Sequence, residues 1–156
     1  MIIEICATSI ESILNAQNAG AHRLELCQNY SIGGVTPSEQ FLHGAIKVSS
    51  LPINVLIRPK GGDFIFNDKE YDLMINKINL FKVYNVKGFV IGFMEKDRSL
   101  NSDILSEFRK ITKGFELTFH RAFDFLANQE ESLELLIEKN FDRILCSGHK
   151  LSAEKG

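Results

Sequence analysis

The sequence predicts an α/β fold in which parallel strands curl into a barrel with helices on its outside. First, short apolar runs alternate with amphipathic stretches along the whole chain, which is typical of repeated βα units around a parallel sheet. Second, ionisable and apolar residues alternate within the expected strands: Glu4 and Cys6 share one face, whereas Ile5 lies on the other. An open doubly wound sheet would bury both faces in apolar surroundings. We therefore expect the polar face to line the lumen of a barrel.

Six runs rich in β-branched and apolar residues are the expected strands: 2–6, 23–27, 53–58, 88–93, 115–120 and 143–147. The alternation recurs along them, since Glu25 and Cys27 oppose Leu26 in the second run. A complete barrel has eight βα units and roughly 250 residues, whereas this chain has 156 residues and about six units. No linker or low-complexity tract divides it. The expected fold is an incomplete barrel that forms a single domain over residues 1–156.

Four helix starts carry a capping signal, in which a side-chain oxygen accepts a backbone N–H and an acidic residue three positions on returns the bond. The expected caps are Thr8, Thr36, Asn67 and Asn128. Pro37 would occupy the first position of the second helix. Apolar residues at helical spacing predict a further helix around Leu105, while Gly20 and Asn140 are expected to end helices. Residues 151–154 resemble the first turn of another helix.

Composition excludes several classes of protein. The chain has 18 Lys and Arg against 20 Asp and Glu, a formal net charge of −2, so we expect no nucleic-acid partner. No apolar run approaches the roughly 18 residues of a membrane helix, and the N-terminus lacks the basic start of a signal peptide. We expect a cytoplasmic protein without a membrane partner, whose three cysteines are reduced thiols.

Five segments stand in a distinctive order and spacing: Glu4-Ile5-Cys6, Arg23-Leu24-Glu25-Leu26-Cys27, Gly33-Gly34-Val35-Thr36-Pro37-Ser38, Ile57-Arg58-Pro59-Lys60-Gly61-Gly62-Asp63-Phe64 and Thr118-Phe119-His120-Arg121-Ala122-Phe123-Asp124. Together they resemble the copper homeostasis protein CutC family over essentially the whole chain. The resemblance implies a TIM-type (β/α) barrel, a cytoplasmic location and a role in copper tolerance or copper binding.

The sequence departs from that family after residues 144–148, because the family continues into two further strands. We therefore expect a C-terminally truncated member, an incomplete TIM-type barrel whose sheet has two open edges. Open edges carry backbone groups without partners, and the helix-facing surface beside them is apolar. A homo-oligomer, or poor solubility of the chain on its own, is the expected result.

Cys6 and Cys27 are the expected copper ligands. They fall at equivalent positions of two neighbouring strands, which lie about 4.8 Å apart, and both are expected to face the lumen near its carboxyl-terminal mouth. Thiolates are ligands that select Cu(I). With the family resemblance, this pair predicts a copper homeostasis protein that binds and handles Cu(I) in the cytosol. The alternative is two small buried thiols without a ligand; Cys146 is expected to face the helices.

A second group of residues supports a different function, a TIM-barrel enzyme or binding protein that acts on an anionic small molecule at the same mouth. Arg58 and His120 end their expected strands, and Asp124 follows in the next loop. Arg58 would clamp the anion, while His120 with Glu25 or Asp124 would act as acid and base. The alternative is an ion-pair network in the lumen, in which two glutamates neutralise two arginines: Glu4, Glu25, Arg23 and Arg58.

Two further patterns bear on ligands. The glycine pairs at 33–34 and 61–62 are interpreted as tight turns, or as places where backbone N–H groups approach an anion. No two histidines have the spacing of a helical or zinc-finger site, so we expect no zinc.

Overall fold

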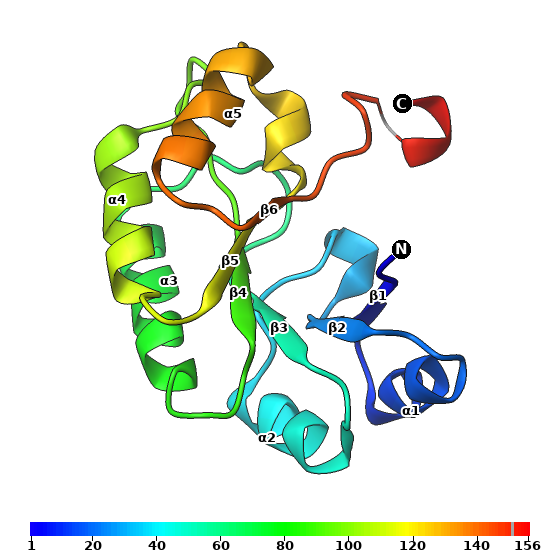
Figure 1. The fold of residues 1–156 in the computed structure, drawn as a ribbon. Coiled ribbons are helices and arrows are strands. Elements are labelled where there is room, and N and C mark those ends of the chain that lie inside the picture. The colour runs from blue at the N-terminus through cyan, green and yellow to red at the C-terminus, as the bar shows by residue number, and fades with distance from the viewer. Residues whose placement is uncertain (151) are drawn as a thin grey trace.

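The computed structural model of the protein describes residues 1–150 and 152–156. Six parallel strands form one sheet in the order β1-β2-β3-β4-β5-β6 (Figure 1). Their bounds are β1 Glu4–Ala7, β2 Arg23–Leu26, β3 Ile53–Leu56, β4 Gly88–Ile91, β5 Glu116–Phe119 and β6 Arg143–Ile144. Each strand pairs with the one that follows it in the chain. This is the connectivity of a (β/α) barrel.

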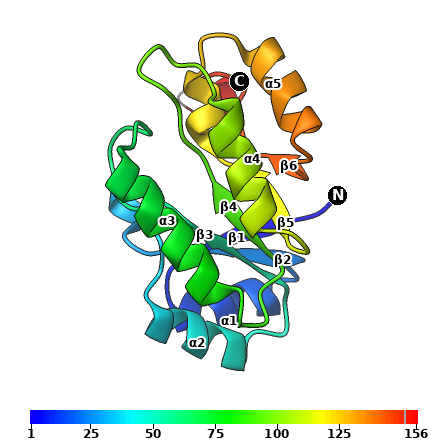
Figure 2. The same ribbon diagram turned by 90° about the vertical axis from the view of Figure 1, so that its left-hand side faces the viewer.

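Helices connect the strands and lie on the outside of the curled sheet (Figures 1 and 2). The α-helices are α1 Ile10–Asn18, α2 Glu39–Val48, α3 Asp68–Phe81, α4 Ser102–Ile111 and α5 Gln129–Glu138. The 3-10 helices are η1 Tyr30–Ile32, η2 Arg121–Phe125 and η3 Ala153–Lys155. None of the helices in the described ranges has the length and hydropathy needed to cross a bilayer.

The expected incomplete TIM-type barrel is confirmed. The sheet curls from β1 to β6, and these two end strands are not paired with each other in the part of the chain that the structure describes. Outward side chains at this edge are correspondingly accessible, with Ile5 of β1 38% exposed and Ile3, just before β1, 40% exposed. Of the expected terminal helix, Leu151 lies outside the described residues, and Ala153–Lys155 form a 3-10 turn instead of an α-helical one.

The expected strands are confirmed in number, order and direction, but most of them are shorter at the carboxyl end. Arg58, Phe93 and His120, predicted as the last residues of strands, lie just past the paired residues. The hydrogen bonding does continue at these ends, since the N–H of His120 donates to the carbonyl of Ile91 at 2.7 Å. The backbone of His120 is therefore still fixed to the neighbouring strand, although the paired part of its own strand has ended.

Two of the four predicted helix caps are confirmed. Asn67 caps α3, and its side-chain oxygen accepts the N–H of Glu70 at 3.1 Å while Glu70 returns the bond to the N–H of Asn67 at 2.9 Å. Asn128 caps α5. Gly20, at φ +79°, and Asn140, at φ +58°, follow α1 and α5 in the left-handed conformation expected of residues that end a helix.

Two other predicted caps are wrong. Ser9 caps α1 in place of Thr8, because the hydroxyl of Ser12 accepts the Ser9 N–H at 3.0 Å and so supplies the returning bond. Ser38 caps α2 in place of Thr36. Thr36 is held elsewhere, since its hydroxyl accepts the backbone N–H of Arg58 at 2.8 Å.

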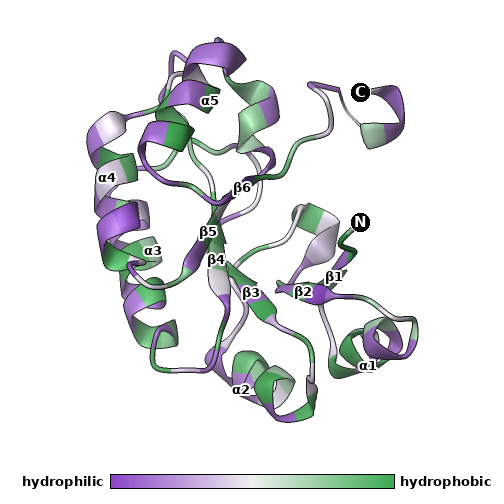
Figure 3. Cartoon of the chain, in the orientation of Figure 1, coloured by the Kyte–Doolittle hydropathy of each residue, from purple (hydrophilic) through white to green (hydrophobic). Residues whose placement is uncertain are grey.

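The apolar core lies between the sheet and the helices. Leu24 and Leu26, Val55, Phe89, and Leu117 and Phe119 point outward from the strands and are fully buried. Helices contribute their apolar stripes to this layer and turn polar residues outward (Figure 3). Burial of this layer is what holds the strands in their curl.

The inner face is polar at its amino-terminal end. Glu4 pairs with Arg23 and also accepts a hydrogen bond from the side-chain amide of Asn54 at 3.1 Å. Across the sheet, Glu116 pairs with Arg143 at 2.6 Å. Charges are thus neutralised in pairs at this end of the sheet. For Glu4 and Arg23 this is the ion pair that the sequence offered as an alternative to a catalytic role.

Candidate functional site

The candidate site is a cavity of about 310 Å³ at the carboxyl ends of the strands. Four of the residues predicted from the sequence line it, namely Cys6, Glu25, Arg58 and His120. The complete lining adds Tyr30, Gly33, Leu56, Phe64, Arg121 and Leu145. This is the end of a (β/α) barrel at which enzymes of this architecture place their active sites.

Strand register explains why these side chains meet. Cys6 is the direct partner of Glu25 across β1 and β2, and Glu25 is the partner of Asn54 on β3. Direct partners in a parallel sheet point to the same face. His120 follows β5 immediately and Arg58 lies two residues past the end of β3, so both keep the inward phase at the mouth.

The two expected copper ligands do not occupy equivalent positions, which corrects the prediction. Cys6 is level with Glu25, so Cys27, the residue directly after β2, lies two residues farther toward the mouth. The reason is the stagger that strands must adopt to curl into a barrel, which shifts β2 relative to β1. Given strand spacing and rise, the two Cα atoms are roughly 8 Å apart.

Both thiols face the inner side of the sheet. Cys27 is 2% exposed and packs with Leu56 and Val90 in a small inner cluster that is separate from the main core. Cys6 is accessible from the cavity, and its thiol lies 3.9 Å from the carboxylate of Glu25, to which it can donate. All three cysteines are free thiols.

The environment keeps both thiols protonated. Burial, and after it the charge of Glu25, raises the pKa of Cys6 to about 12. The same two causes raise the pKa of Cys27 to about 11, and Cys27 in turn contributes to the shift at Cys6. Glu25 is itself buried, and burial followed by the charge of Glu4 raises its pKa to about 7.

Arg58 is held by backbone carbonyls and not by a carboxylate. Its Nη1 donates to the carbonyls of Gly33 at 3.2 Å and Gly34 at 3.1 Å, and its Nη2 donates to the carbonyl of Gly62 at 2.6 Å. The two glycine pairs therefore turn their carbonyl oxygens toward the guanidinium of Arg58. The alternative prediction, that they offer N–H groups to an anion, is not what these contacts show. A side chain at Gly33, where φ is +88°, would come within 2.9 Å of Nη1. Burial lowers the pKa of Arg58.

His120 is fixed as one neutral tautomer. Its Nδ1 accepts the backbone N–H of Ala122 at 3.1 Å, so Nε2 carries the proton. The imidazole lies over Gly92, where a Cβ would overlap the ring. Burial, and next the charge of Arg58, lowers the pKa of His120 to about 3.

Asp124 lies apart from the cavity lining and holds the chain after β6. It accepts the N–H groups of Ser147 at 3.0 Å and His149 at 3.1 Å, and it pairs with Arg121 at 3.0 Å. Burial would raise its pKa, but these donors together lower it. In this arrangement Asp124 positions a backbone segment and the side chain of Arg121.

Phe64 is a site residue that sequence reasoning missed. Its ring centroid is 4.6 Å from the guanidinium carbon of Arg58 and 4.9 Å from the imidazole centroid of His120. The ring also contacts Phe125. Its position two residues after the Gly61-Gly62 turn was the available signal, because such a turn can fold the chain that follows back over the strand end.

The described ranges contain no cluster of three or more His, Cys, Asp or Glu side chains arranged to hold a metal ion.

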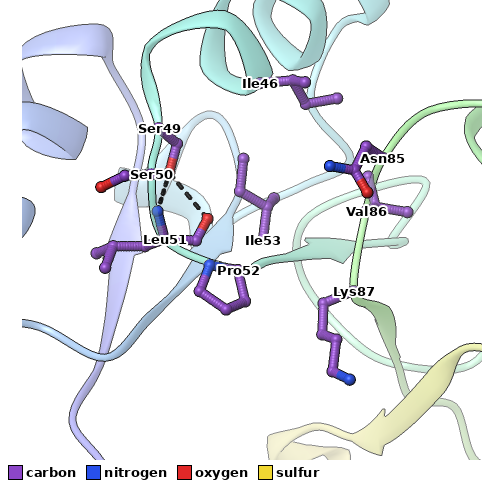
Figure 4. Close-up of a pocket in the computed structure, with 9 residues that line it drawn as sticks. All are labelled: Ile46, Ser49, Ser50, Leu51, Pro52, Ile53, Asn85, Val86 and Lys87. Carbon is purple, nitrogen blue, oxygen red and sulfur yellow. Dashed lines mark hydrogen bonds between the residues drawn. The ribbon is translucent and has the colours of Figure 1, made fainter.

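A second cavity of similar size, about 320 Å³, lies at the opposite end of the sheet (Figure 4). It is formed by the chain before β3 and β4, from Ser49 to Ile53 and from Asn85 to Lys87, with Ile46. The hydroxyl of Ser49 is bonded within it to the backbone of Leu51. Lys87 is the one ionisable side chain of its lining and pairs with Glu116 at 3.1 Å. This cavity offers little chemistry, so the candidate site is the one at the mouth.

Comparison with known proteins supports a single family. The CutC family model matches residues 1–156. A family protein CutC of Pasteurella multocida is 42% identical over 156 residues, which are 100% of this chain and 64% of that protein. A human protein named copper homeostasis protein cutC homolog is 38% identical over 99% of this chain and 57% of its own length.

Solved structures agree with the sequence comparison. The crystal structure of CutC from Streptococcus agalactiae matches with a TM-score of 0.89 and 29% identity, over 97% of this chain and 75% of that one. This chain spans less than two thirds of the length of the Pasteurella and human relatives. Because the family model and these relatives match it from end to end, the chain belongs to the CutC family.

Proposed function

We propose that this chain takes part in copper homeostasis in the cytoplasm, by binding and handling Cu(I) through Cys6 and Cys27. The observation that carries the proposal is the thiol pair, two free cysteines on neighbouring strands that face the same inner wall. The printed name of the human relative, a copper homeostasis protein homolog, supports the choice of metal.

The chemistry of the pair suits Cu(I) as cargo. Thiolates are soft ligands and select Cu(I) over harder ions, and Cu(I) accepts a low coordination number. With Cα atoms roughly 8 Å apart, two side chains turned toward each other can share one ion. Cys6 lines the cavity whereas Cys27 does not, so an incoming Cu(I) ion would meet Cys6 first.

Binding has a proton cost that follows from the site. The pKa values of Cys6, about 12, and Cys27, about 11, keep both thiols protonated at neutral pH. Cu(I) has to displace these protons, because only the thiolate is a ligand. The affinity for Cu(I) therefore rises with pH.

Anaerobic titration of the reduced protein with Cu(I) against a competing chelator tests the proposal. We expect one equivalent to bind, and we expect Cys6→Ser and Cys27→Ser each to weaken binding by more than the roughly 10–100-fold that loss of an outer partner costs. Cys146→Ser is the matched control, since Cys146 is exposed and lies beyond β6. Unchanged affinity in the double variant would remove the thiol site.

A second candidate function is that of a barrel enzyme or binding protein for an anionic small molecule. The observation that favours it is Arg58, a buried guanidinium that, in the described part of the chain, has no carboxylate within salt-bridge distance. Arg58 would hold the anion, with Glu25 and His120 beside it on the cavity wall. Asp124, assigned the same acid–base role from the sequence, would act through Arg121.

A thermal-shift screen with anionic metabolites tests this candidate. A stabilising anion whose effect disappears in folded Arg58→Ala would support it, whereas no response to any anion at constant ionic strength would remove it.

A further inference from the structure

We propose that the mouth cavity binds a small monocarboxylic acid with an apolar body, whose carboxylate accepts hydrogen bonds from Nε of Arg58 and Nε2 of His120. The inference rests on the second candidate function and names its ligand class. It also changes the role of His120 from an acid or base to a fixed neutral donor.

The first argument is a pair of donors without acceptors. Nε of Arg58 and Nε2 of His120 are buried nitrogens that have no hydrogen-bond partner in residues 1–150 and 152–156. Arg58 is 4% exposed and His120 is 5% exposed. A buried donor without an acceptor costs about 1–3 kcal/mol, and more when it is charged. Both side chains line the same cavity.

The orientation of both donors is fixed before a ligand arrives. Three glycine carbonyls occupy the terminal nitrogens of Arg58, and the N–H of Ala122 occupies Nδ1 of His120. The donors left for a ligand are Nε–H of Arg58, beside the second N–H of its Nη2, and Nε2–H of His120. Donors that are already held lose little entropy on binding.

Charge favours a monoanion. Arg58 contributes one positive charge without a paired carboxylate among the described residues, and His120 contributes a neutral N–H. Glu25 lies on the same cavity wall and opposes a second negative charge. Arg121 also lines the cavity, but it pairs with Asp124 at 3.0 Å. A carboxylate therefore matches the charge of Arg58, whereas a phosphate dianion would leave one charge uncompensated beside it.

The rest of the wall favours an apolar body. Leu56, Phe64 and Leu145 line the cavity, and its volume of about 310 Å³ is at the lower end of the range for small-molecule sites. The Phe64 ring contacts both Arg58 and His120. Both nitrogens are covered in the structure. A carboxylate reaches them only if a neighbouring side chain moves, and we assign that movement to Phe64, which packs against both residues. The preceding Gly61-Gly62 turn, with Gly62 at φ +86°, is where the chain can change direction.

Calorimetric titration with acetate, butyrate and benzoate, beside inorganic phosphate and chloride at equal ionic strength, tests the inference. The informative variants are at His120, because Arg58 also holds three carbonyls and its loss can prevent folding. His120→Asn keeps an oxygen near Nδ1 to accept the Ala122 N–H but places no donor at Nε2. His120→Gln places an amide nitrogen near Nε2. Arg98→Met, which removes an exposed charge away from the cavity, is the control.

We expect butyrate or benzoate to bind the parent and Arg98→Met equally, to lose at least tenfold in affinity in His120→Asn, and to recover part of it in His120→Gln. In parent protein, binding should also shift the His120 Nε2 resonance. Carboxylate binding that His120→Asn leaves unchanged would overturn the inference. Phosphate binding without carboxylate binding would overturn it too, while leaving the second candidate function in place; absence of binding by any anion would remove both.

Discussion

Glu25 is a buried carboxyl group that forms no salt bridge with the other described residues. It is 6% exposed, and among the described residues its one hydrogen-bond partner is the thiol of Cys6. Burial first, and then the neighbouring charge of Glu4, raises its pKa from 4.5 to about 7. The folded protein thus holds a proton on Glu25 that the unfolded chain releases above pH 4.5.

This shift predicts a loss of stability as pH rises. The contribution of Glu25 is fully present below pH 4.5 and is lost as pH rises to about 7. Glu25→Gln cannot ionise, so we expect it to be more stable than the parent by about 2–3 kcal/mol at pH 8 and to show little of this advantage at pH 4.5. Denaturant unfolding at both pH values measures the difference, with Glu11→Gln on the exposed face of α1 as control. An equal effect at both pH values would contradict the assigned pKa.

The sequence predicted four of the side chains that line the mouth cavity, while their catalytic and metal-binding roles stay predictions. Cys6, Glu25, Arg58 and His120 were identified from their inward phase at strand ends, and they do line one cavity. The relative height of Cys6 and Cys27 could not be predicted, because the stagger between strands is set by closure of the whole sheet and not by either strand alone.

Strands β4 and β5 position His120 through a close contact that only a glycine at position 92 allows. The imidazole of His120, after β5, occupies the space where a side chain at Gly92, after β4, would lie. The two strand ends are held level by the bond from His120 N–H to the Ile91 carbonyl. β4 and β5 therefore fix the ring jointly.

Gly92→Ala is expected to displace His120 and to destabilise the protein by roughly 1–3 kcal/mol, the usual cost of overpacking. Gly44→Ala is a matched control in α2, where the added Cβ would be in ordinary contact, 3.5 Å from Ile10. There we expect no loss, because alanine favours helix over glycine by up to about 1 kcal/mol. Thermal unfolding compares the two, and equal stability of both variants would contradict the packing.

Helix caps show how far a local sequence pattern can predict where a helix begins. Asn67 caps α3 as its Glu70 signal indicated. Thr36 carried a similar signal, yet its hydroxyl is used by the backbone of Arg58, and Ser38 caps α2 instead. A tertiary bond thus overrides a local preference that is worth about 1 kcal/mol.

At the scale of the whole molecule, the open sheet is the dominant feature. We propose that residues 1–156 form one domain whose β1 edge and the chain after β6 are the places of self-association. Ile5 on β1 is 38% exposed and Leu145 after β6 is 40% exposed. Open edges with apolar neighbours favour pairing between chains.

We expect light scattering to find a homo-oligomer whose mass rises with protein concentration. Ile5→Lys should lower that mass, because a charge beside an edge opposes strand pairing. Leu73→Lys is the matched control on α3, since Leu73 is 53% exposed and lies away from both edges. A parent that stays monomeric at all concentrations, or an equal effect of both variants, would contradict self-association through the β1 edge.

X-ray absorption at the copper edge of the Cu(I)-loaded protein would show directly whether one ion binds between Cys6 and Cys27. We expect a first shell dominated by two sulfur atoms in the parent and in Cys146→Ser. We also expect this shell to be lost in the Cys6→Ser/Cys27→Ser double variant. A first shell of nitrogen or oxygen in the parent, or a sulfur shell that persists in the double variant, would contradict binding between these two thiols.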